Sequence, residues 1–181
     1  MWVVRIPREL EGMEILIYGY LQGRYNSGFS PFYYVAPEVI CGELSLKNSR
    51  GVEEVMTKLL SENKIQGEKI SGGMFKIIGS SLNPEGSFVM LPWDYLVKIV
   101  GSGHKYKYQL LTFYVRLFEH KNNSTGRVGK IPLSSFSDQF NVSTSTGIRY
   151  IKFLEDLGVL KVYHNRANNG YTNIYSLPEG T

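Results

Sequence analysis

The sequence predicts an α+β fold made of two similar small domains in tandem, and three observations support this prediction. First, 181 residues are enough for two small domains. Second, hydrophobic residues make up 43% of the chain and aromatic residues 13%, which is enough to fill folded cores and excludes a disordered polypeptide. Third, the chain aligns with itself at a shift of 96 residues without a gap. The aligned pairs include Tyr18 with Tyr114, Leu21 with Leu117, Val35 with Ile131, Ile40 with Phe136, Leu44 with Phe140, and Gly51 with Gly147.

The self-alignment also suggests where the domains begin and end. A repeat this long indicates two copies of a domain rather than a solenoid of short units. Residues 81–87 are rich in Ser, Asn, Pro and Gly, which is the composition of a linker. We therefore predict a first domain at residues 1–80 and a second at residues 88–181. The segment Arg5–Leu10 resembles Met90–Leu96 at a smaller shift, which indicates an insertion near residues 98–107.

The first helix of the first domain is predicted at Met13–Tyr25. By itself this segment is ambiguous, because Gly19 and Gly23 weaken a helix and the apolar run also suits a strand. Its counterpart, Gln109–His120, lacks glycine and places Leu110, Phe113, Tyr114 and Leu117 at helical spacing. We therefore expect both segments to be helices.

The remaining elements of the first domain follow in order. Phe32–Val35 is aromatic and β-branched, which predicts a short strand. Pro37 suits the first turn of a second helix, and Asn48 suits the N-cap of a third helix with apolar residues at helical spacing. Lys64–Ile70 and Met74–Ile78 are predicted strands around a turn at Ser71-Gly-Gly73.

The second domain repeats this order. We expect a short extra helix at Pro92–Val100, helices at Gln109–His120, Leu133–Phe140 and Thr144–Leu157, a loop at residues 122–126, and strands at Val128–Ile131, Val159–His164 and Tyr171–Leu177. Gly158 suits a left-handed C-cap of the last helix. The polar loop Asn165–Gly170 would join the last two strands.

Helix, short strand, helix, tight turn, helix and two-stranded hairpin is the layout of a winged helix-turn-helix domain. In the second domain, Phe140-Asn-Val-Ser143 would form the turn, with Phe140 and Val142 buried and Asn141 either in a left-handed conformation or hydrogen-bonded locally. The sequence therefore predicts two tandem winged helix-turn-helix domains, each with three helices and a small antiparallel hairpin.

In this layout the third helix of the second domain is the predicted DNA-recognition helix. Its N-terminus offers free N–H groups and a positive dipole end that suit a phosphate, and its early residues would face base edges in the major groove. The candidate DNA-binding residues are Ser143, Thr144, Ser145, Thr146, Arg149, Tyr150 and Lys152 on the helix, and Arg166, Asn168 and Asn169 in the wing loop. We expect Ser145, Thr146, Arg149, Tyr150 and Lys152 to face away from Ile148, Ile151 and Leu154. An ordinary solvated helix face and hairpin is the alternative.

The equivalent helix of the first domain is a weaker candidate. Lys47, Ser49, Arg50 and Lys69 could contact DNA, but Glu53 and Glu54 on the same helix would repel phosphate. Two interpretations remain open here: contact with the DNA backbone, or dimerisation and the binding of a protein partner.

The chain resembles plasmid and phage replication initiators and replisome organisers with two winged helices in tandem. The resemblance rests on Leu91-Pro92 followed by Leu96 before the second domain, on Phe140-Asn-Val-Ser143 with Thr146-Gly-Ile148, and on Leu154-Glu-Asp-Leu-Gly-Val-Leu160. At the level of fold it covers roughly nine tenths of the chain, and the motifs are specific to the winged-helix class. It implies binding to double-stranded DNA at repeated origin sites, often with a monomer–dimer switch.

Three functions are compatible with these features. The first is a sequence-specific double-stranded DNA-binding protein of the replication initiator or organiser type. The second is a transcriptional regulator, such as a repressor of a phage or mobile element. The third is a protein-interaction or chromosome-structure winged-helix module that does not bind DNA. The expected partners are double-stranded DNA, with a homodimer and a replication or transcription protein as further candidates.

The charge balance and the absence of other motifs narrow the classes of function that the sequence allows. Twenty Lys and Arg against 16 Asp and Glu give a net charge of +4, which is compatible with nucleic acid. Without a nucleotide-binding motif, paired carboxylates or clustered histidines, we predict no enzyme activity, no catalytic residues, no cofactor and no metal site. The single cysteine, Cys41, and the absence of a long apolar run predict a cytoplasmic protein with no membrane partner.

One further cluster is basic and aromatic: Lys105, Tyr106, Lys107, Tyr108 and Arg116. It suits either the solvated start of a helix or a contact with the DNA backbone, and the sequence favours neither interpretation.

Overall fold

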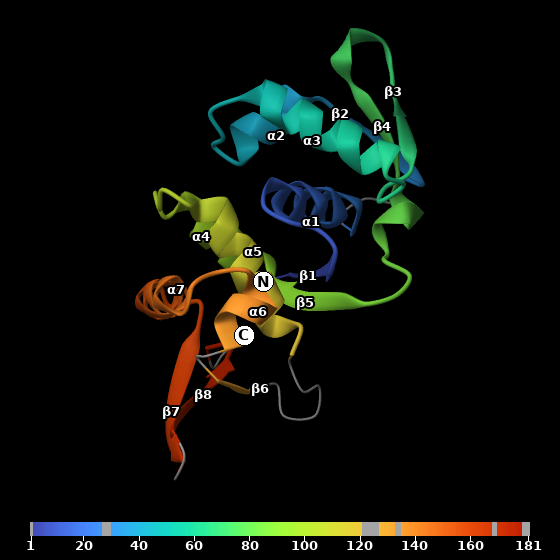
Figure 1. The fold of residues 1–181 in the computed structure, drawn as a ribbon. Helices are drawn as coiled ribbons and strands as arrows, with labels where there is room; N and C mark the ends of the chain where they lie inside the picture. The colour runs from blue at the N-terminus through green and yellow to red at the C-terminus, as the bar shows by residue number, and fades with distance from the viewer. Residues whose placement is uncertain (1, 27–29, 121–126, 133–134, 168–169, 179–181) are drawn as a thin grey trace. The chain divides into compact units, whose positions relative to one another are not determined.

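The computed structural model describes residues 2–26, 30–120, 127–132, 135–167 and 170–178, and it is α+β (Figure 1). The chain divides into two compact units, residues 2–97 (the first unit) and residues 98–181 (the second unit). This division lies downstream of the linker predicted at residues 81–87, because the strand that follows the linker belongs to the first unit.

The first unit contains a three-stranded and a two-stranded antiparallel sheet. Its strands are β1 (Val3–Pro7), β2 (Phe32–Val35), β3 (Gly67–Lys69), β4 (Phe75–Ile78) and β5 (Phe88–Pro92), and its helices are α1 (Met13–Asn26), α2 (Pro37–Glu43) and α3 (Ser49–Ser61). The three-stranded sheet has the order β2-β4-β3, and β1 pairs with β5. Short 3-10 turns, η1 (Ser71–Gly73) and η2 (Gly79–Leu82), flank β4.

The centre of the first unit is α1, which lies between α3 and β1 (Figure 1). It is buried on all sides from Glu14 to Gly23, as expected for a helix inside a core rather than on a surface. Its two glycines make room for tryptophans. A Cβ on Gly19 would lie 2.8 Å from the Trp93 ring, and one on Gly23 would lie 2.5 Å from the Trp2 ring. The glycines that made this segment ambiguous in the sequence therefore permit close packing of two indoles.

A buried amide connects α1 to β1. The Gln22 Oε1 atom accepts a hydrogen bond from the Arg5 N–H at 2.6 Å, and its Nε2 donates to the carbonyls of Arg5 at 3.3 Å and Leu82 at 2.6 Å. The Gln22 side chain thus pairs with the backbone of β1 much as a neighbouring strand would, and it satisfies groups that would otherwise be buried without partners.

The second unit repeats the same order of elements. Helix α4 (Trp93–Gly101) runs from the first unit into the second, and it is followed by α5 (Lys107–Phe118), β6 (Arg127–Pro132), α6 (Phe136–Phe140), α7 (Thr144–Asp156), β7 (Lys161–Ala167) and β8 (Gly170–Ser176). The antiparallel sheet has the order β6-β8-β7, which matches β2-β4-β3 of the first unit.

An aromatic core holds the helices of the second unit together. The Phe113 ring of α5 lies 5.8 Å from Phe136 and 5.1 Å from Phe140, both on α6. The Tyr114 hydroxyl donates a hydrogen bond of 2.9 Å to the Val159 carbonyl, next to the start of β7. The ring contacts join α5 to α6, and the Tyr114 hydrogen bond joins α5 to the segment after α7.

Most of the predicted elements are confirmed, with small shifts of their ends. Phe32–Val35 forms the predicted strand, and the helix that follows Asn48 begins at Ser49. The strand predicted at residues 64–70 is shorter, because Lys64 and Ile65 instead donate backbone hydrogen bonds to the Leu59 carbonyl at the end of α3. The helix predicted from Leu133 begins at Phe136, and the loop at residues 122–126 lies outside the described residues.

Candidate nucleic-acid interface

Helix α7 begins with a hydroxyl cap that the turn before it positions. Asn141, the C-cap of α6, has the left-handed conformation (φ 52°) that asparagine tolerates better than most residues. Ser143 then caps α7, since its Oγ accepts a hydrogen bond from the Thr146 N–H at 3.2 Å. The same Oγ lies 3.1 Å from the Ser145 Oγ and donates to the Thr146 Oγ1 at 2.9 Å. The first turn of α7 therefore carries a cluster of hydroxyl groups at its positive end.

The buried stripe of α7 differs from the predicted one. Gly147, Tyr150, Ile151 and Leu154 face the core, whereas Ile148 is 45% exposed. Tyr150 was expected on the outward face, but it is only 7% exposed and its ring lies 5.5 Å from Phe113. The expected positions of Tyr150 (exposed) and Ile148 (buried) were wrong for the same reason. Gly147 lies so close to Phe136 that a Cβ would be 2.0 Å from its ring. This close approach sets the rotation of the helix.

The exposed residues of α7 are Ser145, Ile148, Arg149 and Lys152 on its first turns and the acidic Glu155 and Asp156 at its C-terminal end. Arg149 lies along the helix surface, with Nε 3.4 Å from the Ser145 carbonyl and Nη2 3.4 Å from the Thr146 Oγ1. Within the described part of the chain, neither Arg149 nor Lys152 forms an ion pair with a carboxylate. Ile148 is the residue of this face that the sequence prediction missed, because its hydrophobicity suggested the core.

Thr144 and Thr146 are half-buried at the start of the helix. In the wing, β7 and β8 pair from Lys161 and Ser176 out to Ala167 and Gly170, so the Arg166 backbone is paired with Tyr171. The Arg166 side chain lies outside the described structure, and so do Asn168 and Asn169 entirely. Midway along the hairpin, the His164 Nδ1 lies 3.1 Å from the Asn173 Oδ1, and these two residues are register partners.

The corresponding helix of the first unit, α3, has a different electrostatic environment. Asn48 caps it by accepting a hydrogen bond from the Arg50 N–H at 3.0 Å. The Arg50 Nε lies 3.1 Å from Glu54, and the Lys69 Nζ lies 2.5 Å from Glu53. Lys47 is exposed and Ser49 is half-buried. Two of the basic groups predicted to contact DNA from this unit are thus already paired with carboxylates of the helix itself.

The turn between the second and third helices differs by one residue in the two units. Left-handed Ser45 (φ 50°) precedes the cap Asn48 by three positions, whereas left-handed Asn141 precedes the cap Ser143 by two. The gapless self-alignment was therefore wrong by one residue in this helix. With the caps superposed, Glu54 corresponds to Arg149 and Thr57 corresponds to Lys152.

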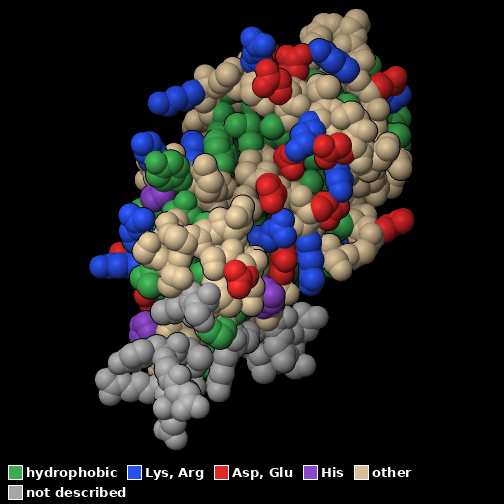
Figure 2. Space-filling view, viewed as in Figure 1, with side chains coloured by type: hydrophobic (Ala, Val, Ile, Leu, Met, Phe, Trp, Pro, Cys, Tyr) green, Lys and Arg blue, Asp and Glu red, His purple; other side chains and the backbone are tan. Residues whose placement is uncertain are grey.

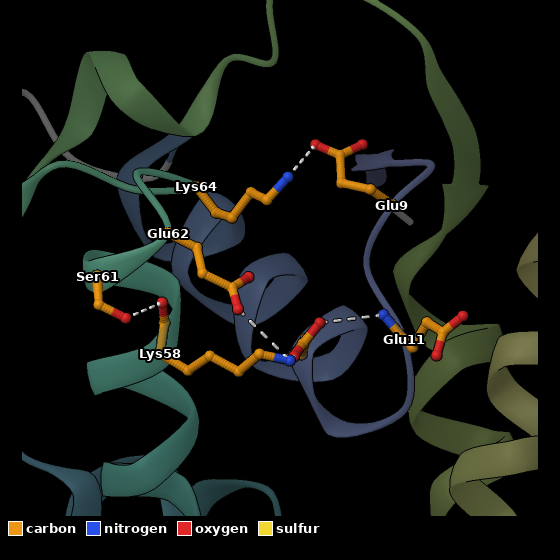
Figure 3. Close-up of polar contacts among 7 residues, drawn as sticks. Glu9, Glu11, Lys58, Ser61, Glu62 and Lys64 are labelled. Atoms are coloured by element: carbon orange, nitrogen blue, oxygen red, sulfur yellow. Dashed lines mark hydrogen bonds and ion pairs between the residues drawn. The ribbon is translucent and has the colours of Figure 1, made fainter.

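Further ion pairs connect the C-terminal part of α3 and the residues just after it to α1 and to the segment before α1 (Figure 3). Lys58 pairs with Glu14, a carboxylate that also accepts the Glu11 N–H at 3.2 Å, and with Glu62 at 3.8 Å. Just beyond α3, Lys64 pairs with Glu9 at 2.9 Å. The hydrogen bond to Glu14 raises the pKa of Lys58 above its usual value. These lysines pair with carboxylates of their own unit, although the Lys58 side chain is 53% exposed.

The formal charge is divided unevenly between the units. Residues 98–181 contain 11 Lys and Arg and 5 Asp and Glu, a net charge of +6, whereas residues 2–97 contain 9 and 11, a net charge of −2. On the face shown in Figure 2, basic and acidic side chains intermingle over the elements of the first unit. An anionic ligand would therefore be attracted to the second unit.

No protein-family model matches the chain, and no curated protein matches it. Among the described residues, no three His, Cys, Asp or Glu side chains converge in a way that could hold a metal ion. No helix in the part of the chain that the structure covers is both long enough and apolar enough to cross a membrane.

Proposed function

We propose that the chain is a sequence-specific double-stranded DNA-binding protein made of two tandem winged helix-turn-helix domains, and that α7 is its recognition helix. The observation that carries this proposal is the exposed face of α7. It presents Arg149 and Lys152 without carboxylate partners among the described residues, behind a hydroxyl-capped N-terminus, in a unit with a net charge of +6. The matching sheet orders, β2-β4-β3 and β6-β8-β7, support the assignment of one domain type to both units.

The side chains of this face suit the major groove. An arginine can donate two hydrogen bonds to guanine, and an apolar side chain such as Ile148 can contact a thymine methyl group. The N-terminus of α7, with Ser143 and Ser145, suits a backbone phosphate. The three kinds of contact together would give both affinity and sequence preference.

The test is binding of the full chain to duplex DNA, measured by fluorescence anisotropy over a range of salt concentrations. We expect Arg149→Ala to lower affinity about 5- to 150-fold at a cognate site, which corresponds to about 1–3 kcal/mol. Tyr150→Phe is the matched control on the same helix, because it keeps the buried ring and removes only the hydroxyl, and it should bind as the wild type does. Unchanged binding by Arg149→Ala would overturn the assignment of α7.

The biological role that we propose is replication initiation or origin organisation, with transcriptional regulation of a phage or mobile element as the alternative. Both roles use the same surface, so they differ in where the protein binds. Genome-wide footprinting separates them: protected repeats within a replication origin support initiation, whereas an operator overlapping a promoter supports regulation.

A second function, self-association, is favoured for the first unit. Tyr34 is 54% exposed and Val39 48%, and with Met74 they line a pocket of about 440 Å³ together with Tyr20 and Tyr33. Exposed apolar groups gathered in one place commonly mark protein interfaces. We propose that this surface binds a second copy of the chain. Sedimentation velocity should show a dimer that Tyr34→Lys converts to monomer, and a monomeric wild type would overturn the proposal.

A further inference from the structure

We propose that the turn between α4 and α5, residues 104–107, is a second DNA contact that holds the phosphate backbone beside the groove occupied by α7. This inference rests on the proposed function of α7 and extends its footprint to a segment outside the helix-turn-helix. It also assigns a role to the basic and aromatic cluster that the sequence left open.

The first step is that this turn is fixed to α7. The His104 ring lies 4.7 Å from Phe153 and 5.9 Å from Tyr150, both of which belong to α7. The His104 Nδ1 accepts a hydrogen bond from the Tyr106 N–H at 3.1 Å, and the Ser102 Oγ accepts one from the His104 N–H at 3.3 Å. His104 therefore anchors the turn to the recognition helix by ring packing and fixes its backbone by hydrogen bonds.

The second step concerns which edge of α7 the turn borders. Phe153 follows Arg149 by four residues, so the two side chains lie one above the other on the same edge of the helix. A turn that packs on Phe153 is consequently next to the edge that carries Arg149. The opposite edge of the exposed face, which carries Ile148, lies away from it.

The third step is the chemistry that the turn exposes. Tyr106 is 48% exposed, and the Lys105 ammonium lies 5.2 Å from its ring centre. The Lys107 ammonium lies 5.3 Å from the ring centre of Tyr108. Neither lysine forms an ion pair with a carboxylate in the portion of the chain that is described. Two ammonium groups held over aromatic rings, one of which belongs to an exposed tyrosine, form a surface for an anion rather than for an apolar partner.

The fourth step is geometric. When a recognition helix occupies the major groove, which is about 12 Å wide, the sugar–phosphate backbones run along both of its edges. A basic turn fixed to one edge of that helix therefore faces a phosphate strand. Lysine and tyrosine side chains are ordinary phosphate ligands in protein–DNA complexes, and such contacts fix register rather than sequence.

The experiment compares the salt dependence of duplex binding by the full-length wild type and by the double variant Lys105→Gln/Lys107→Gln. Each phosphate contact contributes about 0.9 to the slope of log affinity against log salt, so we expect the slope to fall by about 2. The affinity ratio between a cognate and a random duplex should stay unchanged. The matched control is Lys64→Gln/Lys76→Gln, which removes the same charge from the first unit and should leave the slope as it is.

The outcomes separate the two proposals. If the wild type binds duplex DNA and the Lys105/Lys107 variant keeps the wild-type slope, the turn contact is wrong while the role of α7 stands. If both double variants lower the slope equally, the effect is one of net charge and the turn contact is also wrong. If the wild type does not bind duplex DNA at all, the proposed function itself fails. Restoration of the slope by Lys105→Arg/Lys107→Arg would support the turn contact.

Discussion

Gly147 shows how one small residue sets which side chains of α7 reach the surface. Its Cα lies against the Phe136 ring, and the buried stripe that results contains Tyr150, Ile151 and Leu154. Ile148 is then turned outward despite its hydrophobicity. A larger residue at position 147 would have to push α7 away from α6 or rotate it.

We predict that Gly147→Ala destabilises the protein by about 1–2 kcal/mol. Alanine favours a helix by up to about 1 kcal/mol over glycine, but overpacking a core costs about 1–3 kcal/mol, and a Cβ 2.0 Å from Phe136 is severe overpacking. Denaturant unfolding followed by circular dichroism measures the change. Gly42→Ala on α2 is the control, because a Cβ there meets nothing within 4 Å, and it should be neutral or stabilising.

Wild-type stability in Gly147→Ala would contradict this account of the helix. It would mean that α7 can rotate at little cost, and that the exposed set of Ser145, Ile148, Arg149 and Lys152 is not fixed by packing.

At the level of elements, the caps of α3 and α7 determine the alignment of the two units better than hydrophobicity does. Asn48 and Ser143 each accept a hydrogen bond near the start of the helix, and they superpose only when the turn of the first unit is allowed one more residue. The two units then differ sharply at one position, since Glu54 corresponds to Arg149. The equivalent helices α3 and α7 therefore carry opposite charges at the position where a recognition helix would contact DNA.

We predict that Ser143→Ala and Asn48→Ala have similar effects on stability and different effects on DNA binding. Loss of an N-cap costs about 1 kcal/mol in either helix. Only Ser143→Ala should also weaken duplex binding, because only α7 is proposed to contact DNA. Denaturant unfolding and fluorescence anisotropy on the same two variants check both parts, and equal losses of affinity would argue that both helices bind DNA.

The pairing of β1 with β5 connects two elements of similar sequence. Arg5-Ile6-Pro7 resembles Met90-Leu91-Pro92, and in the antiparallel register Arg5 lies opposite Met90. The two similar segments therefore lie antiparallel to each other, with the Arg5–Met90 pair at the centre of the ladder. Because the strand that opens the second sequence repeat completes a sheet in the first unit, the compact units do not coincide with the repeats.

At the scale of the whole molecule, the two units differ in charge and in exposed apolar surface, and each suits a different part of the proposed function. The second unit carries the excess positive charge, and the basic side chains of α7 form no ion pair with the residues that the structure describes. Among the described residues of the first unit, six basic side chains pair with carboxylates. The first unit also exposes the apolar group around Tyr34 and Val39. Salt should accordingly weaken DNA binding strongly and self-association much less.

We predict that the fold fails in alkali through its buried tyrosines. Burial raises the pKa of Tyr18 in the first unit and of Tyr175 in the second above the usual value. Their contribution to stability is complete below the unfolded-state pKa of about 10 and is lost as the pH rises toward the folded-state value, at about 1.4 kcal/mol per pH unit for each group. Tyrosinate absorbance and circular dichroism should therefore change together. Ionisation of both tyrosines with no loss of helix would contradict the prediction.

The sequence by itself determined the order of the helices and of the strands of the two three-stranded sheets, the N-cap region at Asn48 and the approximate span of α7, because these depend on local conformational preferences and on hydrophobic spacing. It left open whether Ser143 or Thr144 caps α7 and whether Asn141 is left-handed, and it did not predict strands β1 and β5. It could not determine the rotation of α7, since glycine carries no hydrophobic signal and the contact of Gly147 with Phe136 exists only in the packed core. Nor could it place β5 against β1, pair Arg50 with Glu54 and Lys69 with Glu53, or bring His104 onto Phe153. Those features join side chains or strands through tertiary packing, and only the folded chain decides which of them meet.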